Sequence, residues 1–201
     1  MIENLTEFRR PGTSLRGVEF TADYLWRLAQ EGRLYVASDA DQDDRVTGQT
    51  SFANTTPTFM LQVPAGITAL PLFLNLSQTG TVAGGAIDAI IEIDSIERYA
   101  SSGTSEKVFN TRKSRNMANK SLLYSGATAV AGYGLRLFAA TMGQDVSPAE
   151  GAVPGPFWKP EIPYFLEGPA AWLVYTYAAT TGPTWYWTAG WAEWSSREIG
   201  P

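Results

Sequence analysis

The chain has 201 residues, of which 44% are hydrophobic, and it contains neither cysteine nor histidine. It therefore lacks disulfides, thiolate nucleophiles and cysteine-type metal sites, as well as the usual general base and the commonest metal ligand. Lys and Arg number 15 and Asp and Glu number 20, so the net charge of −5 disfavours binding to a nucleic-acid backbone.

The length suits a single domain that buries about 70% of the surface of the unfolded chain. The first residues contain no apolar segment of the kind found in signal peptides, and no run of about 18 apolar residues could cross a bilayer. We therefore expect a protein that is made in a cytoplasm and has no membrane partner.

The N-terminal part differs from the rest of the chain. Residues 1–20 mix charged residues with proline and glycine without a sustained period, which predicts an extended arm. A helix is predicted over 22–31, and Gly32 is expected to end it. These features divide the chain into an arm and helix, residues 1–32, and one β domain, residues 33–201.

After about residue 50 the hydrophobic period becomes two, which is typical of strands with one buried face. Leu70, Leu72, Leu74 and Leu76, for example, are expected to share the buried face of one strand. Proline and glycine clusters separate the runs. The runs that predict strands are 34–37, 57–63, 70–76, 86–99, 133–140, 163–166, 171–178 and 184–194.

About eight strands with no crossover helices between them favour two antiparallel sheets over one parallel sheet. The sequence therefore predicts an all-β fold. We expect a two-sheet, jelly-roll-like sandwich with an N-terminal extended arm and one short helix.

An acidic run begins like a calcium-binding loop at Asp39, Asp41 and Asp43. An EF-hand loop would need a glycine where Asp44 stands and an acidic residue where Thr50 stands. A solvated turn is therefore favoured, no metal ligand is assigned, and the binding of Ca²⁺ by the three aspartates stays open.

A second acidic pattern lies in the isoleucine-rich run, where Asp88, Glu92 and Asp94 alternate with apolar residues. Glu92 and Asp94 would be about 7 Å apart on one strand face, a separation that a glycosidase could use. Alternating charge is also what a solvent-facing strand displays. We therefore expect a wet face here and assign no catalytic residue.

The segment between Lys107 and Lys120 is basic, with Arg112, Lys113 and Arg115 and no acidic residue among them. It lacks apolar periodicity and is predicted to be a long loop. A solvated loop is the simpler interpretation, and a contact surface for an acidic neighbour is the alternative. The three inner basic residues are thus candidate interface residues.

The tryptophan-rich run near the C-terminus is the most unusual feature of the sequence. Strand alternation places Trp185, Trp187 and Trp191 on one face and Tyr186 and Trp194 on the other. Large rings on both faces favour a core on one side and a neighbouring subunit on the other, so the first three are candidates for burial and subunit contact. A sugar-stacking platform is the alternative, which leaves a glycan ligand possible.

Several short segments follow one another in an order that carries a resemblance. They are Gly48–Phe52, Thr56–Phe59, Val63–Gly66, Leu70–Leu72, Tyr99–Gly103, Gly168–Trp172 and Trp191–Glu193. Over residues 33–195 this order resembles jelly-roll virion structural proteins of tailed bacteriophages.

The resemblance implies a structural role in a virion that assembles in the host cytoplasm. Such proteins act as capsid cement or decoration proteins or as tail-associated components, commonly form homotrimers, bind no cofactor and catalyse no reaction. The implied partners are further copies of the chain and the major capsid protein or other virion proteins. A tail or baseplate component, a lectin-like carbohydrate-binding or receptor-binding module, and a glycoside hydrolase using Glu92 and Asp94 are the alternatives.

Overall fold

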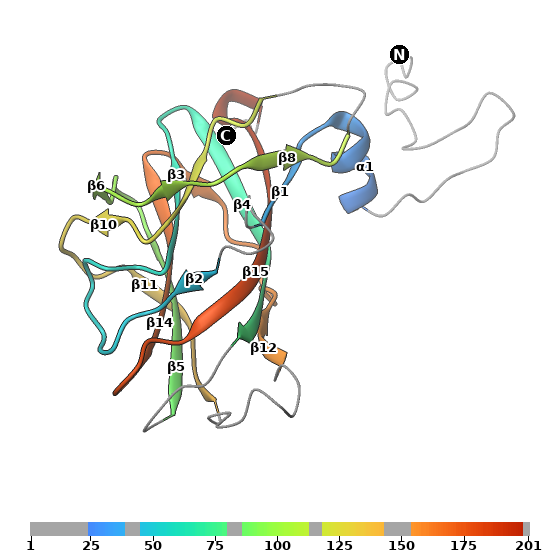
Figure 1. The fold of residues 1–201 in the computed structure, drawn as a ribbon. Coiled ribbons are helices and arrows are strands. Elements are labelled where there is room, and N and C mark those ends of the chain that lie inside the picture. The colour runs from blue at the N-terminus through green and yellow to red at the C-terminus, as the bar shows by residue number, and fades with distance from the viewer. Residues whose placement is uncertain (1–23, 39–44, 80–85, 113–117, 143–153, 199–201) are drawn as a thin grey trace, which may run out of the picture.

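The computed structural model describes residues 24–38, 45–79, 86–112, 118–142 and 154–198. In these residues it has one α-helix, α1 (Tyr24–Glu31), fifteen strands and a short 3₁₀ helix at Ser196–Glu198 (Figure 1). The strands are β1 (Leu34–Ser38), β2 (Val46–Thr47), β3 (Phe59–Val63), β4 (Ile67–Thr79), β5 (Ile87–Asp94), β6 (Tyr99–Ser101), β7 (Thr104–Ser105), β8 (Val108–Asn110), β9 (Leu122–Ser125), β10 (Thr128–Ala129), β11 (Leu135–Met142), β12 (Pro154–Trp158), β13 (Leu166–Glu167), β14 (Ala170–Ala178) and β15 (Thr184–Ser195).

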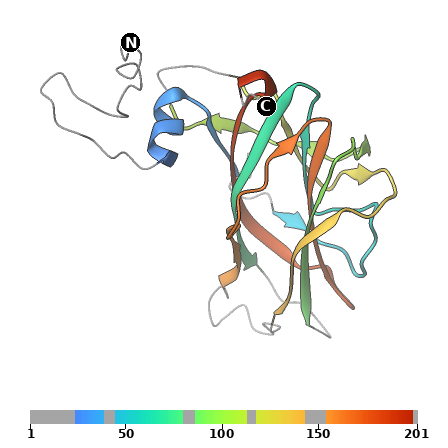
Figure 2. The same cartoon turned by 180° about the vertical axis from the view of Figure 1, so that it is seen from behind.

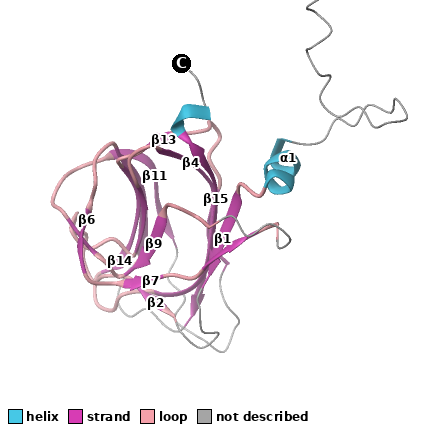
Figure 3. Cartoon of the chain, turned by 90° about the horizontal axis from the view of Figure 1, so that it is seen from above, coloured by secondary structure: helices cyan, strands magenta, loops and turns pink. Residues whose placement is uncertain are grey.

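The strands form a two-layer antiparallel sandwich. A seven-stranded sheet has the order β12-β4-β15-β1-β8, with β13 paired to β4 and β2 to β15, and it faces a six-stranded sheet of order β11-β5-β14-β3-β9-β7. Viewed from above, α1 lies beyond the seven-stranded sheet, on the side away from the other layer (Figure 3). The predicted jelly-roll-like sandwich with one short helix is therefore confirmed, while the predicted arm, residues 1–20, lies outside the described residues.

The helix ends where the sequence predicts. Gly32 adopts a left-handed conformation with φ of 73°, and its N–H donates to the Ala29 carbonyl oxygen at 3.0 Å. The N–H of Arg33 donates in the same way to Leu28 at 2.9 Å. Among the described residues, no helix has the length and apolar character that crossing a bilayer requires.

The main core fills the space between the two sheets with large rings. Phe59, from β3, lies 4.7 Å from Trp187 of β15, measured between ring centroids. Trp158 and Trp172 approach to 5.4 Å by the same measure. Aromatic pairs of this kind add to the free energy gained by burial, and here they join one sheet to the other.

The predicted buried face of β4 is wrong for two of its four leucines because the strand contains a β-bulge. Leu74 and Leu76 lie in the main core as expected, but Leu70 and Leu72 lie on the opposite, outer face of β4. The pairing of β4 with β15 shifts by one residue between Gly190 and Trp191. A bulge inserts an extra residue into one strand, so the alternation of faces changes phase at that point.

The described residues also form more strands than predicted, and many of the additional strands are short. Seven of the described strands have two to four residues: β2, β6, β7, β8, β9, β10 and β13. Runs this short show no measurable period in the sequence. One of them, β8, lies in the basic segment that was expected to be a loop.

The outer face of the six-stranded sheet is covered, which overturns the predicted wet face of β5. A second apolar cluster lies there, in which Ile90 and Tyr175 pack beneath Ala127 and Ala129. Figure 2 shows the strands and loops that lie over this sheet, seen from behind. As a result Glu92, expected in solvent, is only 2% exposed.

Substitutions on the two faces of β15 test which of its side chains point into the core between the sheets. Replacing the fully buried Trp191 by alanine is expected to lower the free energy of unfolding by about 3 to 5 kcal/mol, because a large cavity opens between the sheets. Tyr186→Ala, on the outer face of the same strand, should cost less than about 1 kcal/mol. Urea unfolding of both variants makes the comparison, and equal losses would contradict the arrangement.

Candidate assembly surface

The outer face of the seven-stranded sheet carries apolar side chains that the main core does not use. Leu70 and the partly buried Leu72 and Trp194 lie there, and Leu28 of α1 packs against them. Phe165 meets Trp194 edge to face, with ring centroids 6.0 Å apart. The part of this sheet next to α1 is therefore apolar on both faces, although the second layer covers only one.

A groove of about 400 Å³ opens on this face beside α1. Its walls are mainly apolar and include Leu25, Val36, Leu72 and Phe73. The ring of Phe73 lies so close to Gly190 that a side-chain carbon placed on the glycine would be 2.2 Å from the ring. A glycine inside a strand permits this close approach.

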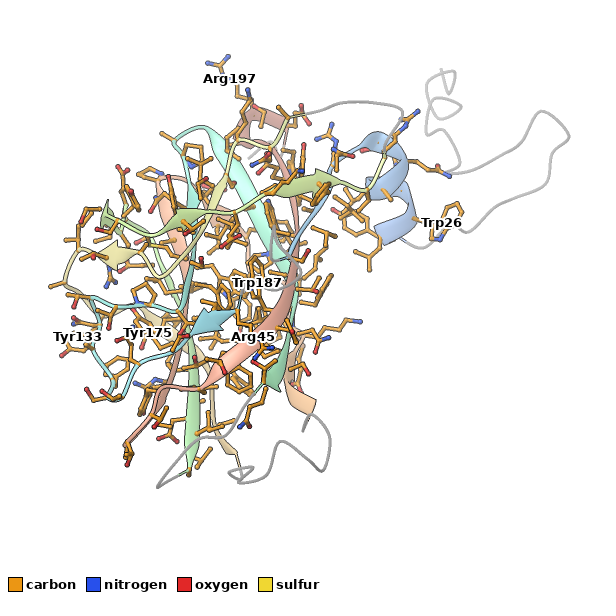
Figure 4. All side chains as sticks on the ribbon, viewed as in Figure 1. Trp26, Arg45, Tyr133, Tyr175, Trp187 and Arg197 are labelled. Carbon is orange, nitrogen blue, oxygen red and sulfur yellow. The ribbon has the colours of Figure 1, made fainter. Side chains whose placement is uncertain are left out.

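The helix next to the groove exposes aromatic rings. Trp26 is 66% exposed and Tyr24 is 55% exposed. Figure 4 shows Trp26 pointing away from the body of the sandwich. An aromatic side chain this exposed beside an apolar groove is typical of a surface that contacts another protein.

Polar contacts hold the end of α1 to the sheet. The Asn110 side-chain amide on β8 donates to the Gly32 carbonyl oxygen at 2.6 Å, and the Arg112 guanidinium donates to the Gln30 carbonyl oxygen. Arg112 is thus partly occupied inside its own chain. The other two basic candidates, Lys113 and Arg115, lie outside the described residues.

The three tryptophans proposed for the interface lie inside the chain. Trp185 and Trp191 are fully buried, Trp187 is nearly so, and the Trp185 Nε1–H donates to Thr176 Oγ1 at 3.0 Å. The predicted core on one side of β15 is therefore present. A neighbour on the other side would meet Tyr186 and Trp194 instead of the three buried rings.

Asp94, at the end of β5, belongs to a buried polar network centred on Arg98. This guanidinium is fully buried and donates to Asp94 Oδ2 at 2.7 Å and to the carbonyl oxygens of Val130, Asn54 and Gly132 at 2.8 to 3.1 Å. The last three residues lie in the segments that cover the six-stranded sheet. Arg98 therefore fastens the cover to the sheet.

Two further groups lie in this network. Glu92 Oε1 is 3.7 Å from Arg136 Nε, while its Oε2 has no hydrogen-bond partner among the described residues. Burial raises the pKa of Tyr175 to about 12, an effect that Arg98 partly opposes and the Glu92 carboxylate increases. Little of either β5 carboxylate that was considered for glycoside hydrolysis is accessible to a sugar chain in this arrangement.

Glu193 is a buried polar residue that the sequence analysis missed. It is 5% exposed and accepts hydrogen bonds from the backbone N–H groups of Lys120 and Ser121 and from Trp191 Nε1. Alternation along β15 places it on the same inner face as Trp191, and this is the signal that could have found it. Glu193 thereby holds the end of the basic segment against the sandwich.

A metal site is not visible in the described parts of the chain, where no three acidic side chains come together. The calcium question at Asp39, Asp41 and Asp43 concerns residues outside those parts. A calcium titration tests Ca²⁺ binding, and an unchanged melting temperature would exclude the site.

Searches against family models, curated proteins and solved structures each found no match for this chain. The similarity to phage jelly-roll proteins thus stays an expectation from its short sequence segments.

The Arg98 network can be tested by removing its centre. Arg98→Met is expected to lower the free energy of unfolding by about 3 to 5 kcal/mol, because Asp94 and three carbonyl groups would lose a buried partner. Arg27→Met, which breaks an exposed ion pair on α1, should cost about 0.5 kcal/mol. Thermal or urea unfolding measures both, and a small loss for Arg98→Met would contradict a fastening role.

The raised pKa of Tyr175 predicts how stability depends on pH. The unfolded chain releases this phenolic proton near pH 10 and the folded chain near pH 12, so the folded state binds more protons between these values. The free energy of unfolding should therefore fall as pH rises through this window. Tyr175→Phe should make that fall shallower, as measured by urea unfolding at several pH values. An unchanged slope would contradict the assignment.

Proposed function

We propose that this chain is a non-enzymatic structural protein of a bacteriophage virion that assembles as a symmetric oligomer, with capsid cement or decoration as its leading role. The observation that carries the proposal is the apolar surface made by α1 and the groove beside it. Soluble proteins rarely expose such surfaces without a partner to cover them.

The use of the other distinctive residues supports a structural role. The tryptophans that could have formed a binding platform fill the space between the sheets, and the carboxylates that could have formed a catalytic pair belong to or adjoin the Arg98 network. The buried tryptophans and the Arg98 network therefore hold the two sheets and the segments that cover them together. A particle component that must persist outside a cell gains from this.

A tail or baseplate component is the alternative within the same class. A carbohydrate-binding or receptor-binding module is the alternative from another class. The rings that motivated it are buried, so such a module would have to use other rings, such as Trp26 or Tyr133. Specific binding on a glycan array would favour that alternative.

The proposal is tested by locating the chain. We expect mass spectrometry to detect it in purified virions of its source and cryo-electron microscopy to place it at symmetric positions on the capsid. A position on the tail would favour the alternative placement. Absence of the chain from virions would overturn the proposed function.

A surface variant tests the observation on which the proposal depends. Trp26→Ser should leave the fold intact, because the ring is exposed, and should reduce incorporation of the chain into particles. Ile96→Ser, which changes an exposed apolar residue on the connection after β5 in the other sheet, serves as the matched control. Equal incorporation of the two variants would show that the α1 surface is not the contact.

A further inference from the structure

The six-stranded sheet ends in a long open edge. β11 has eight residues and pairs with β5 on one side, and among the described residues no strand pairs with its other side. The backbone N–H and C=O groups along such an edge can pair with another chain. A long edge strand therefore needs either protection or a partner.

The other edge strands of the two sheets are shorter than β11, and one of them contains prolines. β7 and β8 have only two and three residues, and β12 has five residues that include Pro154 and Pro156. Short strands and prolines prevent unwanted pairing. Along the whole of β11, in contrast, the sequence LRLFAATM has no proline and only one charged residue, Arg136.

The side chains along β11 also fit a contact. Leu135 is 63% exposed, and Tyr133 just before the strand is 81% exposed. A cavity of about 380 Å³ lies next to the strand, with Leu137, Phe138 and the exposed Ile162 among its lining residues. Exposed apolar and aromatic side chains thus lie near this edge, beside a cavity whose lining also includes the charged residues Lys159 and Glu161.

The order of residues on β11 is complementary to itself. A bulge places Leu137 and Phe138 together opposite one residue of β5. When the two count as one position, the strand has seven positions with Ala139 at the centre. In an antiparallel pair about Ala139, Arg136 of one copy lies opposite Thr141 of the other. Residues that face outward in one copy then lie opposite residues that face outward in the other.

Charges then match as well. Thr141 donates a hydrogen bond to Asp88 of its own chain at 2.6 Å. In the paired strands, Asp88 of one copy lies two strands away from Arg136 of the other, across Thr141, and the long Arg136 side chain can extend over Thr141 towards this carboxylate. The contact occurs twice about the symmetry axis, and it would add an opposite charge to Arg136, which lies 3.7 Å from Glu92 of its own chain.

We propose that two copies of this chain pair through β11, antiparallel about a two-fold axis at Ala139, so that their six-stranded sheets form one continuous sheet. This inference deepens the proposed function by naming the contact between copies, and it rests on that function only for its biological use. The contact itself is a property of the purified chain.

A cysteine scan tests the register, since the chain has no cysteine of its own. Ala139→Cys places two thiols across the axis, where Cα atoms about 4.5 to 5.5 Å apart suit a disulfide. Mild oxidation should then give a covalent dimer on a non-reducing gel. Thr141→Cys, whose two copies would be about 13 Å apart along the strands, should not. Equal cross-linking of both variants, or none of Ala139→Cys, would overturn the register.

Charge variants at the same exposed position test the contact itself. In sedimentation velocity we expect a dimer for the unaltered chain, loss of the dimer for Ala139→Lys and for Ala139→Glu, and its return when the two variants are mixed. Thr104→Lys on the edge strand β7 should leave the dimer unchanged. A monomeric unaltered chain, or a dimer or trimer insensitive to both Ala139 variants, would overturn the inference, while the presence of the chain in virions would still support the proposed function.

Discussion

The packing of aromatic rings between the two sheets is the interaction on which the rest of this structure depends. β15 lies in the middle of the seven-stranded sheet and presents Trp185, Trp187 and Trp191 to the opposite layer. Each ring buries a large apolar area, and the layers can be held without disulfides because the core is this large. The rings that hold the sandwich cannot also serve a ligand, so recognition is left to the outer faces and edges.

The sequence predicted most reliably what local periodicity determines. Long runs such as Ala171–Ala178 and Thr184–Trp194 form the central strands, and Gly32 ends the helix because a left-handed residue was needed there. The bulge beside Leu72 could not be predicted, because it arises from pairing with β15, a strand more than a hundred residues away. Strands of two to four residues were not predicted for a related reason, since only long-range pairing defines them.

The buried polar groups show a second limit of sequence reasoning. Alternation correctly placed Glu92 on the face of β5 opposite the core, but that face is covered by segments around residues 52 and 127–132. Under this cover Arg98 pairs with Asp94, while Arg136 lies 3.7 Å from Glu92, and neither pairing can be read from local alternation. The groove beside α1 was equally invisible, because its walls come from segments far apart in the chain. The burial of Glu193, in contrast, could have been predicted from the alternation of faces along β15.

The two proposed contacts use different physics, and this difference suits different partners. Pairing of strand edges requires matching length, register and alternation over eight residues, which an identical copy provides automatically through two-fold symmetry. An apolar groove with an exposed ring requires only a complementary shape, so an unrelated protein can fill it. The groove lies on the outside of the seven-stranded sheet and β11 at the edge of the other sheet. Because the contacts share no strand, each can be broken while the other is kept, which makes attachment to a particle and association between copies separable properties.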